Sequence, residues 1–277
     1  MNVNLYAMDG SKKEKVSLPD QFSEEIREDL IKKAVLAIHS HNRQPYGAFV
    51  KAGQRASAKI SRRRRKFKGS YGIGISRVPR KSLWKRGKRF GWVGAFAPCT
   101  VGGRRAHPPK SEKIWSWVLN VKERRKAIRS ALAATALAEL VQKRGHKFKE
   151  FAFVVDGKVE DLNKTKDVEA FLTKLGLGQE LIRIGQKKVR AGKGKIRGRR
   201  YQLKVGPLFV VSQSCKLIKS ARNIAGVSVC LVKDLNVLAL APGGLMGRYT
   251  IFTKSALDVL AEKKLFTNQT QKKELKQ

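Results

Sequence analysis

Hydrophobic residues recur with a regular period in some stretches of the chain and lose it in others. The apolar run Val3–Ala7 ends at Asp9-Gly10, a dipeptide typical of hairpin turns, so Lys15–Leu18 is expected to pair with it. Apolar residues then recur every four positions, which predicts an amphipathic helix over Glu24–Ser40 with Ser23 as its N-cap. This part of the chain should fold as ordinary globular protein.

A second regular region begins at Ser111. Its periodicity predicts helices over Ile114–Leu119, Lys122–Arg144, Thr165–Leu175, Gln179–Ala191 and Lys254–Lys264. Short apolar runs predict buried strands at Phe151–Val155, Leu208–Val211, Gly226–Val232 and Tyr249–Phe252. Apolar strands alternating with helices are typical of a parallel sheet with helices on its faces. The pattern therefore predicts an α/β fold with an open, mainly parallel sheet and flanking helices.

Between these regions, the stretch Arg43–Ser111 keeps neither a 3.6-residue nor a 2-residue period, and Gly and Pro interrupt it repeatedly. A connection this long without structure of its own is uncommon in a compact domain unless it is functional. We therefore expect a long extended loop at 43–111, inserted between two helices of one body. The body would be discontinuous, at 1–42 and 112–265, with a polar tail at 266–277.

The distribution of charge identifies the class of partner. The chain has a net charge of +40, and Arg43–Ser111 contains 20 Lys and Arg with no Asp or Glu. Residues 1–42 have a net charge of −1, and a second acid-free run extends from Leu181 to Lys233. Such a loop buries too little apolar surface to offset its ordering entropy, and its like charges repel. It needs a polyanion, and RNA is the most plausible one.

Several function classes find no support in the sequence. The three cysteines lack C-x-x-C spacing and are odd in number, which indicates neither a disulfide framework nor a zinc site and fits a reducing cytoplasm. The N-terminus lacks the pattern of a signal peptide, and no apolar run of 18 residues indicates a membrane span. The basic tracts contain no carboxylate to hold Mg²⁺ beside bound nucleic acid. No catalytic residue, metal ligand or cofactor is predicted.

Three motifs carry the nucleic-acid hypothesis. The five consecutive cations Arg62–Lys66 could be a solvated charge run or a localisation signal, but they lie within an 82-residue acid-free stretch, which favours phosphate contact. Trp84–Phe96 interleaves aromatic rings, cations and glycines. Its rings could seal a small satellite core, but the scarcity of aliphatic neighbours favours stacking on unpaired bases or packing on RNA. Arg190–Arg200 alternates Gly with cations, yet it lacks the spacing of a nucleotide-binding P-loop.

The predicted RNA-binding residues come from these tracts and from their flanking turns. They are Arg55, Lys59, Arg62, Arg63, Arg64, Arg65, Lys66, Lys68, Arg77, Arg80, Lys81, Arg104, Arg105, His107, Arg190, Lys193, Lys195, Arg197, Arg199, Arg200, Arg222 and Arg248.

Motifs spread along nearly the whole chain resemble a known family. They are Gln44-Pro45-Tyr46, Gly102–Lys110 (GGRRAHPPK), Ile128–Ala136 (IRSALAATA), Arg190–Arg197 (RAGKGKIR), Arg222–Gly226 (RNIAG) and Leu240–Arg248 (LAPGGLMGR). In this order they resemble the large-subunit ribosomal proteins of universal family four, in their archaeal and eukaryotic form. Ala225 departs from the proline expected there, at a turn.

The resemblance implies a body on the outside of the large ribosomal subunit and a loop threaded into ribosomal RNA. The tip of the loop, near Trp84–Gly103, would help form the nascent-peptide exit tunnel, so ribosomal RNA, neighbouring ribosomal proteins and the nascent chain are the implied partners. The side chains expected to line the tunnel are Arg86, Lys88, Arg89 and Trp92. Two alternatives remain open from the residues alone: an architectural DNA- or RNA-binding protein, and an RNA-modifying enzyme with a basic arm.

Overall fold

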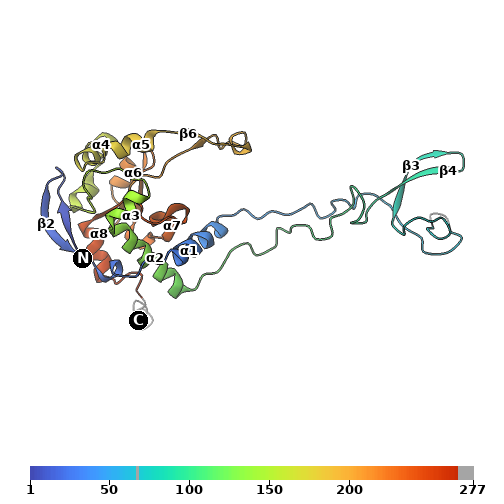
Figure 1. Ribbon diagram of the computed structural model, residues 1–277, viewed down its shortest axis with the longest axis horizontal. Coiled ribbons are helices and arrows are strands. Elements are labelled where there is room, and N and C mark those ends of the chain that lie inside the picture. Colours follow the sequence, from blue (N-terminus) through green and yellow to red (C-terminus); the bar gives the residue numbers. More distant parts are fainter. Residues whose placement is uncertain (67–68, 268–277) are drawn as a thin grey trace. The chain divides into compact units, whose positions relative to one another are not determined.

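Two compact units make up the computed structural model, which describes residues 1–66 and 69–267. One unit, here called the body, combines Met1–Asn42 with the chain from Ser116 onward. The other, here called the inserted segment, is the continuous stretch Arg43–Trp115. Figure 1 colours both along the sequence. Lys68 and the tail expected at 266–277, apart from its first two residues, lie outside the described residues.

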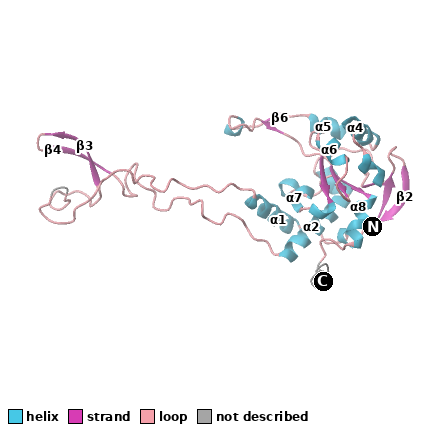
Figure 2. Cartoon of the chain, turned by 180° about the vertical axis from the view of Figure 1, so that it is seen from behind, coloured by secondary structure: helices cyan, strands magenta, loops and turns pink. Residues whose placement is uncertain are grey.

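A six-stranded sheet forms the centre of the body (Figure 2). Its order is β2-β1-β5-β10-β8-β9; β1 and β2 pair antiparallel, and the other neighbours pair parallel. The expected mainly parallel α/β sheet is therefore confirmed. The strands are β1 (Asn2–Tyr6), β2 (Lys12–Ser17), β5 (Val154–Val155), β8 (Leu208–Val211), β9 (Ser228–Leu231) and β10 (Thr250–Thr253).

Helices cover both faces of this sheet, because successive strand residues point to opposite sides. Leu208 and Val210 of β8 enter one core, while Phe209 and Val211 enter the other. The first core is closed by α1 (Glu28–His41), α2 (Val121–Ala136), α7 (Val237–Leu240) and α8 (Lys254–Glu262). The second is closed by α3 (Ala138–Lys143), α4 (Thr165–Lys174), α5 (Gly178–Gly185) and α6 (Leu217–Arg222), and Figure 1 shows α4, α5 and α6 together at the top of the body.

The first helix begins later than its hydrophobic pattern predicts, and the prediction that Ser23 caps it is wrong. α1 starts at Glu28, and Ser23 instead ends a short 3₁₀ helix. Contacts with α2 explain the shift: Arg129 Nε donates to the Glu24 carboxylate at 2.7 Å, and the Arg27 N–H donates to Ser130 Oγ at 2.6 Å. The Glu24 carboxylate and the Arg27 N–H are thus bonded to α2 and not within a longer α1.

The predicted helix over Ile114–Leu119 is absent. The Trp117 N–H donates to Ser40 Oγ at 2.8 Å, and the Trp117 carbonyl lies 3.1 Å from a ring nitrogen of His41, so the end of α1 holds this stretch extended. The long helix predicted next is two helices, because Leu137 adopts an extended conformation between α2 and α3.

Other predicted elements are confirmed in type but differ in extent. The helix predicted over Gln179–Ala191 ends at Gly185, since the chain then enters β6 (Lys188–Val189), which pairs with β7 (Tyr201–Gln202). The strand predicted from Phe151 is limited to β5. Two short helices, α6 and α7, have too few residues to show a period and were not predicted.

Candidate nucleic-acid interface

A β-hairpin lies inside the inserted segment, where no regular element was predicted. β3 (Arg80–Arg86) and β4 (Arg89–Gly94) pair antiparallel with Arg86 opposite Arg89. Gly87 turns the chain with a φ of +54°, which favours glycine. The turn therefore presents the exposed cations Arg86, Lys88 and Arg89 together, which are three of the residues expected to line the tunnel.

The aromatic residues of this hairpin divide into an exposed and a half-buried set. Trp84 is 52% exposed, and its indole ring lies against Gly91 of β4, where any Cβ would collide with it. Trp92 is half-buried beside Ile75, and its ring centroid lies 6.3 Å from that of Phe90. The exposed ring of Trp84 is therefore the one available for stacking, whereas Trp92 packs within the segment.

The basic run Arg62–Lys66 is exposed throughout. The carboxylate–cation pairs of the described residues lie in the body, and none of the cations that the structure describes between Arg43 and Trp115 has such a partner. No carboxylate therefore neutralises these cations in the isolated chain, where solvent and dissolved ions screen their mutual repulsion. Lys68, predicted with this run, lies outside the described residues.

Aromatic and cationic side chains hold the two ends of the inserted segment together. The rings of Tyr46 and Trp115 lie 4.7 Å apart, and the Arg43 guanidinium lies 4.6 Å from the Trp115 ring. The Ala48 N–H also donates to the Pro109 carbonyl at 2.9 Å. The ends are thus adjacent, as expected for an insertion that leaves the body and returns to it.

The second basic tract forms a hairpin closed by β6 and β7. The Arg190 N–H donates to the Arg200 carbonyl at 2.8 Å, and its guanidinium Nε donates to the Arg199 carbonyl at 3.1 Å. Three of its predicted RNA-binding residues, Lys193, Lys195 and Arg197, are exposed around the turn. This region, residues 186–204, is here called the basic hairpin.

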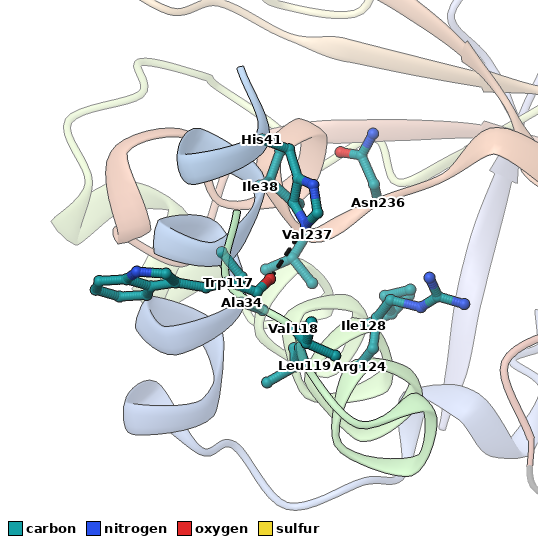
Figure 3. A pocket seen from close by; sticks show the side chains of 11 residues that line it. Ala34, Ile38, His41, Trp117, Val118, Leu119, Arg124, Ile128, Asn236 and Val237 are labelled. Carbon is teal, nitrogen blue, oxygen red and sulfur yellow. Dashed lines mark hydrogen bonds between the residues drawn. The ribbon is translucent and has the colours of Figure 1, made fainter. Parts of the chain in front are cut away.

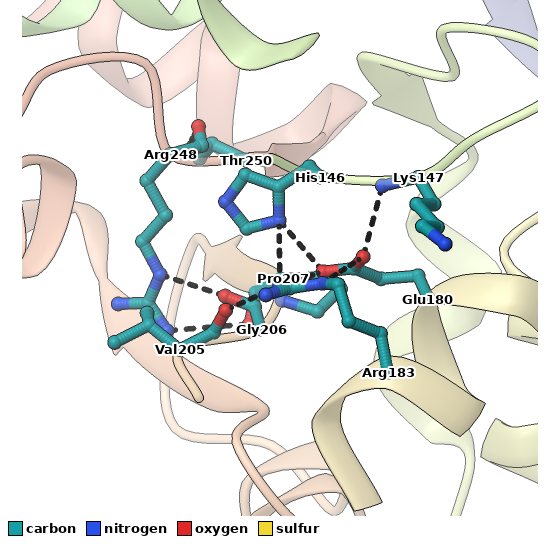
Figure 4. Close-up of polar contacts among 9 residues, drawn as sticks. All are labelled: His146, Lys147, Glu180, Arg183, Val205, Gly206, Pro207, Arg248 and Thr250. Atoms are coloured by element: carbon teal, nitrogen blue, oxygen red, sulfur yellow. Dashed lines mark hydrogen bonds and ion pairs between the residues drawn. The ribbon is translucent and has the colours of Figure 1, made fainter. Parts of the chain in front are cut away.

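Beneath the basic hairpin lies a buried carboxylate, Glu180 of α5, which is 0% exposed (Figure 4). It accepts hydrogen bonds from His146 Nδ1 at 2.6 Å, from the Lys147 N–H at 3.0 Å and from Arg183 Nε at 2.7 Å. Burial would raise the pKa of Glu180, but these donors outweigh it and lower the pKa to about 2. Burial also lowers the pKa of His146, against the pull of Glu180.

Arg248 corrects the sequence-based assignment, because it is buried rather than presented to RNA. It is 4% exposed, and its guanidinium donates to the carbonyls of Gly206 at 2.9 Å and Ala239 at 2.8 Å and to Ser228 Oγ at 2.6 Å. Burial lowers its pKa to about 10. The preceding Gly247 has a φ of +81° and passes so close to the Leu140 carbonyl that a Cβ would lie 2.6 Å from that oxygen.

The remaining predicted RNA-binding residues that the structure describes reach solvent. Arg80, Arg104 and Arg190 are half-buried. The exposed ones are Arg55, Lys59, Arg62, Arg63, Arg64, Arg65, Lys66, Arg77, Lys81, Arg105, His107, Lys193, Lys195, Arg197, Arg199, Arg200 and Arg222. The exposed residues therefore belong to the inserted segment and to the basic hairpin, except Arg222, which is the last residue of α6.

The body also carries an apolar groove of about 260 Å³ (Figure 3). Ile38, Val118 and Val237 line it, and Arg124 lies at its edge. Its walls include no cluster of catalytic side chains. Across residues 1–66 and 69–267 there is no group of three or more His, Cys, Asp or Glu that could hold a metal ion. No helix in that same part of the chain is long and apolar enough to cross a membrane.

Glu180 and Arg183 are the residues of this region that sequence reasoning missed. Their i, i+3 spacing on a helix was a visible signal for a local ion pair. Their burial was not visible, because it depends on His146 and Val205, which lie far away in the chain.

Comparison with known proteins agrees with the resemblance seen in the motifs. A family model described as "Ribosomal protein L4/L1 family" matches residues 16–263. A "Large ribosomal subunit protein uL4" from Nanoarchaeum equitans is 51% identical over 268 residues, covering 96% of this chain and 100% of that protein. The proteins of that name from Archaeoglobus fulgidus and Methanocaldococcus jannaschii are each 44% identical, over 95% of this chain and 99% of theirs. The chain therefore belongs to the ribosomal protein L4/L1 family.

Proposed function

We propose that the chain is a structural, non-catalytic constituent of the large ribosomal subunit and binds ribosomal RNA. One observation carries this proposal: Arg43–Ser111 has 20 Lys and Arg without a single acid. The described cations of that segment have no carboxylate partner, so their counter-charge must come from outside the chain. Phosphates supply it, releasing condensed counterions as they bind. Membership of the family and the names of the relatives support the same reading.

The inserted segment would enter the RNA of the subunit and help form the nascent-peptide exit tunnel. The turn Arg86–Arg89 and the exposed ring of Trp84 are the parts suited to the far end of such a segment. The turn would meet the nascent polypeptide, and the cations of Arg62–Lys66 would bind RNA phosphates. Neighbouring ribosomal proteins are further partners, and the cytoplasmic ribosome is the proposed location.

Sedimentation of a cell lysate tests the proposal. We expect the chain to migrate with the large ribosomal subunit and to stay bound at moderate salt. Migration apart from the subunit at low salt would overturn it. Photo-crosslinking from Lys88 in translating ribosomes tests the tunnel: crosslinks to nascent chains are expected, and crosslinks to RNA or proteins of the subunit surface alone would contradict that role.

The two alternatives make different predictions. An architectural DNA-binding protein would prefer duplex DNA to structured RNA in a competition assay, because its phosphate contacts would follow B-form geometry. An RNA-modifying enzyme would turn over RNA. Neither is favoured by a specific feature of the described structure, and the one acid of the inserted segment, Glu112, lies near its end rather than within the acid-free stretch Arg43–Ser111.

A further inference from the structure

Three successive carbonyls at the return end of the basic hairpin each accept a hydrogen bond from an arginine (Figure 4). Arg183 Nη2 donates to Val205 at 2.7 Å. Arg248 Nε donates to Gly206 at 2.9 Å, and its Nη2 lies 3.4 Å from the Pro207 carbonyl oxygen. Two guanidinium groups, one from α5 and one from the segment just before β10, thus hold one short stretch of backbone.

The first of these arginines is itself held in place. Both oxygens of Glu180 contact the Arg183 guanidinium, at 2.7 Å from Nε and 2.5 Å from Nη2. Glu180 is in turn fixed by His146 and by the Lys147 backbone. Because a paired, planar guanidinium keeps a definite orientation, Nη2 can also donate to the Val205 carbonyl.

The hydrogen bond between Arg183 and Val205 joins two points of the chain that flank the basic hairpin. The chain leaves α5 at Gly185, runs through the basic hairpin and returns at Val205, so Arg183 joins the two ends of the excursion. Residues 186–205 contain nine Lys and Arg and no acid. The like charges of this hairpin repel one another, and its two-residue strands make few hydrogen bonds to hold them together.

The stretch Val205–Pro207, where the hairpin returns to the body, is here called the neck. A close contact between two backbone segments also holds it. The Gly206 N–H donates to the Gly226 carbonyl at 2.9 Å. A Cβ at Gly226 would lie 2.8 Å from the Lys204 carbonyl, so the returning strand sits against the turn before β9 without room for a side chain.

We propose that Glu180, Arg183 and Arg248 are positioning residues for RNA binding, which hold the neck of the basic hairpin so that its cations meet the phosphates in a fixed arrangement. The inference rests on the proposed function and adds to it a role for residues that do not touch RNA. Holding the hairpin before binding lowers the ordering cost that association would otherwise carry. Arg248, which the sequence placed at the RNA, acts instead through the segment Gly206–Pro207.

The variant Glu180→Gln separates this role from charge alone. It removes an acid and makes the chain more positive, so electrostatics alone predicts slightly tighter binding to RNA. Loss of positioning predicts the opposite sign, a dissociation constant raised about tenfold at physiological salt. The probe is large-subunit ribosomal RNA, with the full chain in each case. Glu169→Gln, an exposed acid of α4, is the matched control and should bind no more weakly than the wild type.

A second background distinguishes positioning from a general loss of stability. Residues 188–202 are replaced by a short Gly-Ser linker, and Glu180→Gln is introduced again. If Glu180 acts through the hairpin, its effect on RNA affinity disappears in this background, because the coupled element is gone. An equal loss of affinity in both backgrounds overturns the proposal, and so does unchanged or tighter binding by Glu180→Gln in the intact chain.

Should Glu180→Gln fail to melt cooperatively, Arg183→Met is used at the edge of the network. One lost phosphate contact would lower the slope of log affinity against log salt by less than one, whereas a released hairpin should lower it by about two or more. A change of less than one overturns the proposal. Failure of the wild-type chain to bind the RNA would instead overturn the proposed function, so the two failures are distinguishable.

Discussion

The body and the inserted segment differ in whether their charged side chains are paired within the chain. The ion pairs of the described residues lie in the body, and they include Glu24 with Arg129 and Glu180 with Arg183. The described cations of the inserted segment have no such partners, and among the residues that the structure describes in that segment Ala95 is the one buried apolar side chain. The body therefore completes its interactions within the chain, whereas the inserted segment leaves them to a partner.

This difference indicates that the body supplies the stability of the fold and the inserted segment supplies the affinity for RNA. Phe153, Phe209 and Phe252 are buried on the two faces of the sheet, where apolar burial stabilises the fold. Trp84 and the cations of Arg62–Lys66 face solvent and contribute little to folding. Changes in one unit should leave the function of the other almost intact, and four predictions test this separation.

The largest effect is expected from removing most of the inserted segment. Replacing Lys59–Gly103 with a short linker deletes fourteen Lys and Arg. The affinity for large-subunit RNA should fall by at least about a hundredfold at physiological salt, because the lost phosphate contacts carry most of the electrostatic binding. Thermal unfolding of the body should remain cooperative. Loss of that cooperative transition would mean that the segment is part of the folding core.

A core substitution should show the reverse. Phe252→Ala should lower the free energy of unfolding by about 3–5 kcal/mol, since the side chain is fully buried between Phe22 and Phe153. Trp84→Ala, at an exposed ring, should change it by less than about 0.5 kcal/mol. Urea titrations measure both. A large destabilisation by Trp84→Ala would break the proposed separation of the two units.

Within the inserted segment, replacing Arg62, Arg63, Arg64 and Arg65 with alanine should lower the salt slope of RNA binding by about three, since each single-strand phosphate contact contributes about 0.7. The measurement is affinity at several salt concentrations. Four exposed body lysines are replaced in the matched control, which should change the slope by less than one: Lys158, Lys164, Lys166 and Lys174. Equal slopes in the two variants would show that charge counts and position does not.

The smallest expected effect is on the pH dependence of folding stability, through the hydrogen bonds of Glu180. Hydrogen bonds from Arg183 and His146 hold the pKa of Glu180 at about 2, against an ordinary 4.5 and against the effect of burial. In the unfolded chain the carboxyl takes up a proton near 4.5, so its contribution to stability is complete above that pH and is lost as the pH falls toward about 2. Urea midpoints should therefore fall more steeply over this acid range for the wild type than for Glu180→Gln. Parallel curves would contradict the assignment.

The α/β class of the body was predictable because strand and helix periods are local. The runs at Leu208–Val211 and Thr165–Leu175 are long and regular enough that packing only reinforces them. The start of α1 was not predictable, since Glu24 and Arg27 find partners on α2, about a hundred residues away. The β3–β4 hairpin was missed because its cation-rich strands show no apolar alternation.

For the site, composition alone located the two basic tracts, since unbalanced charge survives any folding pattern. Composition did not show which individual cations are exposed and which are buried. Arg197 is exposed and Arg248 is buried, although both follow a glycine-rich stretch in sequence. What separates them is the set of carbonyls at Gly206 and Ala239, which folding brings to Arg248.

The sequence by itself determined the class of the body, the place of the insertion and the polyanionic nature of the partner, because period and net charge are properties of neighbouring residues. The tertiary structure decided which polar groups are paired within the chain. It turned Arg248 from an expected RNA contact into a support for backbone, and it joined Glu180 to His146 across 34 positions. Burial and hydrogen bonding depend on residues distant in the chain, and a linear pattern does not encode their distances.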